Sequence, residues 1–147
     1  MNWLLALLTL IGGMALPLQA GVNATLSRYL GSPALAALMS FLVGTLALLA
    51  YYLLTRQELP TFTTLKNIPY WVWIGGVLGA FYVLIAVTVA HKLGSATLIA
   101  LTVTGQMLAS LTLDHYGLVG FVETSLSAGR IAGAILLIAG VVLIKIF

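Results

Sequence analysis

The sequence has few charged residues and no cysteine. Only 6% of its residues are Asp, Glu, Lys or Arg, whereas 62% are hydrophobic, and its mean hydropathy is +1.17. Because so few polar residues cannot cover the surface of a soluble domain, the composition predicts an integral membrane protein. The absence of cysteine excludes disulfides, thiol catalysis and thiolate metal sites. The six Lys and Arg residues are dispersed, which argues against nucleic acid as a partner.

Patterns typical of enzymes are also missing. The sequence contains no metal-ligand spacing, no nucleophile motif and no phosphate-binding loop. Asp114 and His115 are adjacent, so their side chains point in different directions on regular structure, and His91 belongs on the opposite face of the membrane. We therefore expect no enzymatic activity, no metal and no cofactor.

Five hydrophobic runs are long enough to cross a bilayer as helices, which takes about 20 residues each. They predict an all-α integral membrane protein, residues 1–147 forming one transmembrane domain. The first four spans would form a four-helix transport bundle, and the fifth would be a C-terminal helix for packing or dimerisation. The first run lacks the basic residues of a signal peptide, since none precedes Arg28, so we interpret it as a retained span. The predicted spans are 3–27, 33–54, 70–90, 95–113 and 128–146.

Short turns separate spans one and two, and spans three and four. Ser32 and Pro33 predict a serine cap followed by proline at the first helical position. Gly94 and Ser95 suggest a similar serine cap before span four. The longer connection 55–69 has room for a short helix at the membrane surface.

Polar residues inside span one form a single stripe. Gln19 and Asn23 are four residues apart, which places them on one side of a helix. Pro17 cannot donate to the carbonyl of Gly13, which predicts a bend with a free carbonyl nearby. One interpretation is a cavity lined by the two amides, and the other is hydrogen bonding that holds neighbouring helices together. The predicted bend favours the cavity.

Span four carries a second stripe, in which Gln106 is the residue most costly to place in an apolar interior. Thr102 and Ser110 share this side of the helix, although Ser and Thr alone are uninformative because they can bond to their own helix backbone. We predict a substrate site formed by the amides of Gln19, Asn23 and Gln106. Tyr82 and Ser110 are secondary candidates. Such a neutral site suits a polar uncharged or zwitterionic solute better than a bare cation.

Glycines at regular spacing predict close helix packing. Gly75 and Gly79 form a small-residue surface in span three. Gly129, Gly133 and Gly140 form another in span five, where we favour helix packing or dimerisation.

The acidic residues all lie at or beyond the ends of spans. None of the three, Glu58, Asp114 and Glu123, is at a span centre. Proton-coupled exporters of cations usually need a buried acidic residue. This chain has none at a span centre, where such a residue would be expected. Asp114 or Glu123 could pair with Arg130, or these charges could simply be solvated.

The basic residues are equally divided between the two sides of the membrane. If the spans alternate, Arg28, Lys92 and Lys145 lie on one side, and the other three lie opposite: Arg56, Lys66 and Arg130. Because an excess of Lys and Arg normally fixes orientation, this balance permits insertion both ways. The expected partner is therefore a second copy, parallel or antiparallel in the bilayer, or a related chain of opposite orientation.

The chain resembles the YdcZ-like family of small bacterial membrane proteins, in the drug/metabolite transporter superfamily. The resemblance covers nearly the whole chain, and the last span also resembles the dimerising helix of small multidrug resistance exporters. The matching stretches are Pro17-Leu18-Gln19, Val22-Asn23-Ala24, Leu30-Gly31-Ser32-Pro33, Ser40-Phe41-Leu42-Val43-Gly44, the segment 69–80, Thr104-Gly105-Gln106, Asp114-His115-Tyr116-Gly117 and Gly129-Arg130-Ile131-Ala132-Gly133.

The resemblance implies a helical bundle in the bacterial inner membrane and transport activity. Small multidrug resistance exporters carry an essential Glu in span one, where this chain has Gln19 and Asn23, so proton-coupled export of cationic drugs does not carry over. We expect a dimeric small-solute transporter that works by alternating access. The alternatives are a dimeric channel and an accessory subunit without transport activity.

Overall fold

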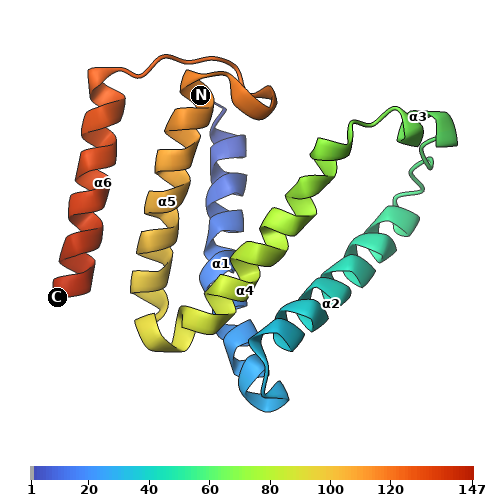
Figure 1. Ribbon diagram of the computed structural model, residues 1–147, viewed down its shortest axis with the longest axis horizontal. Coiled ribbons are helices and arrows are strands. Elements are labelled where there is room, and N and C mark those ends of the chain that lie inside the picture. Colours follow the sequence, from blue (N-terminus) through green and yellow to red (C-terminus); the bar gives the residue numbers. More distant parts are fainter. Residues whose placement is uncertain (1) are drawn as a thin grey trace. The chain divides into compact units, whose positions relative to one another are not determined.

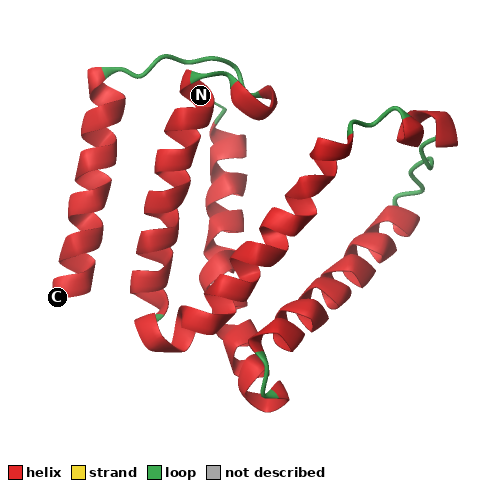
Figure 2. Cartoon of the chain, in the orientation of Figure 1, coloured by secondary structure: helices red, strands yellow, loops and turns green. Residues whose placement is uncertain are grey.

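The computed structural model describes residues 2–147 and is helical, with no strand in this part of the chain (Figures 1 and 2). Five helices in this range are long and apolar enough to cross a membrane, the third beginning with the short helix η1, which confirms the all-α prediction and its five spans. The helices in chain order are α1 (Trp3–Leu30), α2 (Pro33–Leu54), α3 (Phe62–Lys66), η1 (Tyr70–Trp73), α4 (Ile74–Leu93), α5 (Ser95–His115), η2 (Leu118–Gly120) and α6 (Ala128–Ile146).

Glycines in the left-handed conformation follow two of the helices. Gly31 has φ +67° after α1, and Gly94 has φ +77° after α4, a conformation that only glycine adopts at little cost. Ser32 caps α2 as predicted, accepting a hydrogen bond of 3.2 Å from the backbone N–H of Leu35. The serine cap predicted before α5 is wrong: Gly94 takes the cap position, and Ser95 is already helical. The tight reversal of the chain requires glycine there.

The chain forms two compact units, and the boundary between them falls inside α1. One unit is the continuous segment Leu18–His91, which holds the second half of α1, α2 and most of α4. Its core consists of small side chains, because Ala36 and Ala37 of α2 pack with Val83 and Val87 of α4. Small residues let helices approach closely, which is the usual packing mode in a bilayer.

The other unit combines the chain up to Pro17 with Lys92–Phe147. Within it, α5 and α6 lie side by side and antiparallel (Figure 1). Ala134 of α6 is buried, and Leu137 and Val141 on the same side of this helix are half-buried. The fifth span therefore packs against α5, and its role outside a four-helix bundle stays a prediction.

Large apolar side chains cover the surface of the described chain. Leu18, Leu48 and Leu136 are each more than 70% exposed, and within residues 2–147 no large side chain is below 2% exposure. In water this arrangement would leave the apolar surface unburied, but in a bilayer it faces lipid tails while the helices satisfy their own backbone groups. The exposed surface is that of a membrane protein.

Candidate functional site

The predicted site residues are distributed over both units. Gln19, Asn23 and Tyr82 belong to the unit Leu18–His91, and Gln106 and Ser110 belong to the other. A single site formed by all five stays a prediction.

Gln19 lines a groove between α1 and α2. The groove has a volume of about 210 Å³, and its other lining residues come from one side of α2. Phe41, Gly44, Thr45 and Leu48 follow the spacing i, i+3, i+4 and i+7, which places them on one helix face. Ser40 completes the lining. The groove therefore contains one amide and two hydroxyls, all of them neutral, and only the amide is predicted from the sequence.

The hydroxyl of Thr45 differs from those of four other threonines in the spans. Thr9, Thr88, Thr104 and Thr112 each donate to the backbone carbonyl four residues earlier, at 2.7–3.0 Å. Thr45 makes no such bond, and the side chains of Gln19 and Ser40 likewise have no hydrogen-bond partner within residues 2–147. These polar groups remain available for a solute or water.

Asn23 is the one buried polar residue among those described, with 5% of its surface exposed. It lies one turn beyond Gln19 on α1, and its Nδ2 has no hydrogen-bond partner in the part of the chain that the structure covers. A buried donor without a partner costs about 1–3 kcal/mol of stability. The interpretation that Asn23 holds neighbouring helices together predicts a partner within the chain, which Nδ2 lacks here.

Polar side chains on α5 show the same contrast. Thr104 and Thr112 donate to the carbonyls of Ala100 and Leu108 in their own helix. Thr102, Gln106 and Ser110 have no such bond within residues 2–147. The predicted stripe thus also offers unpaired neutral groups, in the unit that contains α5.

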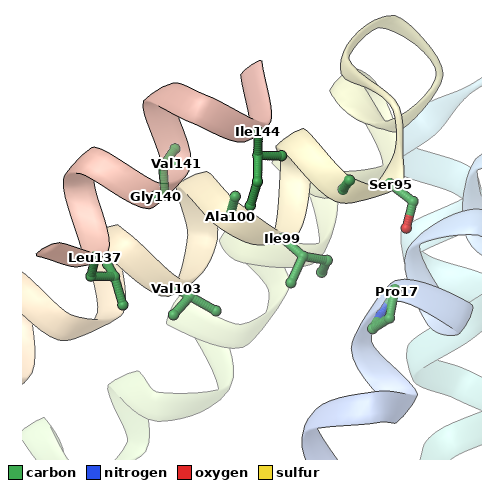
Figure 3. Close-up of a pocket in the computed structure, with 10 residues that line it drawn as sticks. Pro17, Ser95, Ile99, Ala100, Val103, Leu137, Gly140, Val141 and Ile144 are labelled. Carbon is green, nitrogen blue, oxygen red and sulfur yellow. The ribbon is translucent and has the colours of Figure 1, made fainter. Parts of the chain in front are cut away.

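A larger groove lies between α5 and α6 (Figure 3). Its volume is about 490 Å³, and apart from Ser95 its lining is apolar: Pro17, Ala96, Ile99, Ala100, Val103, Leu137, Gly140, Val141 and Ile144. One hydroxyl is too few to orient a polar solute, so this groove suits apolar groups only. Pro17 lies at its edge, and α1 continues through this residue as one helix.

Tyr82 and the glycines of the spans differ in what they contact. Tyr82 packs against the small-residue core and lines neither groove. A Cβ on Gly79 would lie 3.7 Å from Cζ of Phe41, so this glycine permits close contact between α4 and α2. Within residues 2–147, a Cβ added at Gly75, Gly133 or Gly140 would meet no neighbouring atom within 4 Å. The close packing predicted over these three glycines therefore stays a prediction.

Arg130, at the start of α6, forms an ion pair with Asp114 at the end of α5. Its Nη1 also donates to the carbonyl of Thr124 at 3.0 Å, and the backbone N–H of Thr124 donates to the carbonyl of Asp114 at 2.7 Å. Arg130 thereby joins both helices and the connection between them. The arrangement is structural, because it lies at the helix ends and apart from both grooves.

No group of three or more His, Cys, Asp or Glu side chains lies close enough to bind a metal within residues 2–147. The ring of His115 lies 4.7 Å from that of Tyr116, whereas its neighbour Asp114 is bound to Arg130. The two grooves themselves are lined by neutral polar and apolar groups.

Comparison with known proteins gives a match along almost the whole chain. A family model described as "Putative inner membrane exporter, YdcZ" matches residues 4–143. The chain is also 32% identical to the inner membrane protein YdcZ of Escherichia coli (strain K12) over 142 residues, which cover 95% of this chain and 94% of the relative. No solved structure matches the chain. With its five membrane-spanning helices, the chain is a multi-pass protein of the inner membrane and belongs to the YdcZ family.

Proposed function

We propose that the protein is a dimeric transporter of a small neutral or zwitterionic polar solute. The groove between α1 and α2 carries this proposal, because Gln19, Ser40 and Thr45 line it without hydrogen-bond partners within residues 2–147. Unpaired polar groups within a membrane span are costly, so they are retained mainly where they meet water or a solute. Membership in a family described as exporters supports the same conclusion.

The substrate site of this proposal consists of Gln19, Asn23 and Gln106, with Ser110 contributing from α5 and Tyr82 as a wall. All of these side chains are neutral, and Glu58, Asp114 and Glu123 lie outside the span centres. Neutral amides and hydroxyls both donate and accept hydrogen bonds, which suits solutes that do the same. We propose that α1, α2, α4 and α5 form the transport bundle and alternate access to this site.

The assembly is proposed to be an antiparallel dimer. Three Lys and Arg residues lie on each side if the five helices alternate, so neither orientation is favoured. The open space above Gly133 and Gly140 gives a second copy room for close contact on α6. A related chain in the opposite orientation would satisfy the same requirements.

Flux into liposomes containing only the purified protein tests the transport proposal. Osmotic swelling with glycerol, erythritol, urea, glycine and betaine covers neutral and zwitterionic solutes. We expect saturable flux of at least one of them, reduced about tenfold or more in Gln19→Leu and in Gln106→Leu. Thr104→Val is the matched control, because the hydroxyl of Thr104 already bonds to its own helix at 2.9 Å.

Three results would contradict this proposal in different ways. Unchanged flux in both Leu variants, at normal expression, would exclude the site. Very fast flux that does not saturate would indicate a channel. No flux of any solute in the panel would favour an accessory subunit over a transporter of this substrate class.

Thiol labelling in intact cells tests the orientation. The chain has no cysteine, so Gln57→Cys and Val122→Cys each supply a single thiol in exposed loops that lie on the same side by the span count. Partial labelling of both by a membrane-impermeant reagent, completed after permeabilisation, is expected for two orientations. All-or-none labelling would exclude an antiparallel dimer of identical chains.

A further inference from the structure

The groove between α1 and α2 has a lining that is chemically specific. It combines the carboxamide of Gln19 with the hydroxyls of Ser40 and Thr45, and it contains no charged residue. Each of these groups can both donate and accept a hydrogen bond. A cation would need acceptors only and an anion donors only, whereas a hydroxyl or amide group of a solute matches this lining on both counts.

The size of the groove limits what it can hold. Its volume of about 210 Å³ is below the roughly 300 Å³ at which ligand pockets usually begin. Since a water molecule takes about 30 Å³, the groove has space for roughly seven waters or for one end of a small solute. By itself it therefore holds only part of a solute of the usual ligand size.

Lipid tails are a poor occupant of this groove. An acyl chain cannot hydrogen-bond, so it would leave Gln19, Ser40 and Thr45 unpaired in an apolar medium. Water or a polar solute satisfies these groups, whereas the apolar groove between α5 and α6 makes no such demand.

Phe41 forms the apolar wall of the groove, and Gly79 of α4 helps to fix its position. Cζ of Phe41 would lie only 3.7 Å from a Cβ at Gly79, so the ring packs closely over this glycine. The wall is thereby held by α4, while the polar groups come from α1 and α2. A solute with a polar end and a hydrocarbon side fits both surfaces.

We infer that the groove between α1 and α2 is a water-filled half-site for the hydroxyl or amide end of a neutral solute, with Ser40 and Thr45 as specificity-determining residues. This inference rests on the proposed transport function and assigns the substrate class. Neither hydroxyl is distinguishable from the other Ser and Thr residues of the spans by sequence alone. Their assignment depends on the groove and on their free hydroxyls.

Cysteine reactivity in proteoliposomes tests whether the groove contains water. The reactive thiolate forms in water and not in lipid, so a thiol in the groove should react with the impermeant reagent (2-sulfonatoethyl) methanethiosulfonate. We expect Thr45→Cys and Ser40→Cys to react about tenfold or more faster than Leu46→Cys and Leu42→Cys. Leu46 and Leu42 are 57% and 50% exposed, lie in the same helix and do not line the groove. Equal, slow labelling of all four would overturn the inference.

Protection from labelling tests the class of solute. Erythritol, a small neutral polyol, should slow the labelling of Leu48→Cys, a lining position that keeps both hydroxyls, at least about twofold, whereas tetramethylammonium chloride should not. Adding Thr45→Val should abolish the protection, and Thr45→Ser, which retains a hydroxyl, should restore it. Protection by the cation alone, or protection that survives Thr45→Val, would overturn the assignment.

The labelling and flux experiments can contradict the half-site and the transport proposal independently of each other. Fast, erythritol-protected labelling without flux would support the half-site and contradict the transport proposal. Flux without labelling at Thr45→Cys and Ser40→Cys would support transport and overturn the half-site, since the solute would then take another path.

Discussion

Breaking the contacts of Arg130 should destabilise the unit that contains α5 and α6. Arg130→Gln removes the ion pair with Asp114 and the hydrogen bond to the carbonyl of Thr124. Asp114→Asn is milder, because its amide oxygen can still accept from the guanidinium. Lys145→Gln, at the other end of α6 and exposed, is the matched control for loss of a positive charge.

The contacts of Arg130 set the size of the expected effect. A hydrogen bond to a charged group contributes about 1.5–3 kcal/mol. The side chains of Arg130 and Asp114 are 30% and 28% exposed, so solvent reduces this contribution. We expect Arg130→Gln to lower the free energy of unfolding by about 2 kcal/mol, a roughly thirtyfold change in the equilibrium constant. Asp114→Asn should cost about 1 kcal/mol.

A double-mutant cycle measures whether the two residues act through one another. Unfolding in mixed micelles by increasing sodium dodecyl sulfate, followed by tryptophan fluorescence, gives the free energy for each variant. Because the ion pair is lost in either single variant, the double variant should lose about 1 kcal/mol less than the sum. Additive losses, or an Arg130→Gln variant as stable as the Lys145→Gln control, would refute the reasoning.

Two further predictions concern orientation and dimerisation. Lys145→Gln leaves two cations on its own side of the membrane against three on the side that holds the Gln57 loop. The side with more cations should face the cytoplasm, so the Gln57 loop should move there, and Lys66→Gln should have the opposite effect. Labelling of Gln57→Cys in intact cells should accordingly fall in the first variant and rise in the second; equal labelling would show that charge balance does not set the orientation. A side chain at position 133 meets no other atom of the described chain within 4 Å of its Cβ, so Gly133→Leu should fold normally. Its dimerisation in micelles should weaken about tenfold, or by about 1.4 kcal/mol, because the larger side chain prevents close contact between two copies. The control Ile135→Leu should dimerise normally, and an unchanged Gly133→Leu dimer would place the contact elsewhere.

The membrane spans could be predicted because hydropathy and bilayer thickness determine them. The second predicted span, 33–54, has the bounds of α2, and Ser32 caps it as expected. Helix ends beyond the apolar runs were missed, since α1 and α4 continue through polar residues until Gly31 and Gly94 turn the chain. Hydropathy does not register such polar helical turns.

The groove between α1 and α2 could not be predicted in full. Gln19 was identifiable because an amide inside a span is costly, but Ser40 and Thr45 are types that usually bond to their own helix. Whether Thr45 does so depends on its rotamer and neighbours, which the sequence does not reveal. The pairing of α1 with α2 places Gln19 opposite one face of α2. Because α2 is apolar on all sides, its sequence does not indicate which of its faces meets α1. The spacing of Phe41, Gly44 and Thr45 was the available clue.

The boundary inside α1 imposes an order on assembly during synthesis. The unit Leu18–His91 is continuous, so its helices can pack as soon as that segment has been made. The residues up to Pro17 belong to the other unit, whose remaining part, Lys92–Phe147, is made last. Its 56 residues take roughly 3–11 seconds to synthesise at about 5–20 residues per second. Throughout that interval Pro17 is in the membrane without the residues of α5 and α6 that line the larger groove with it.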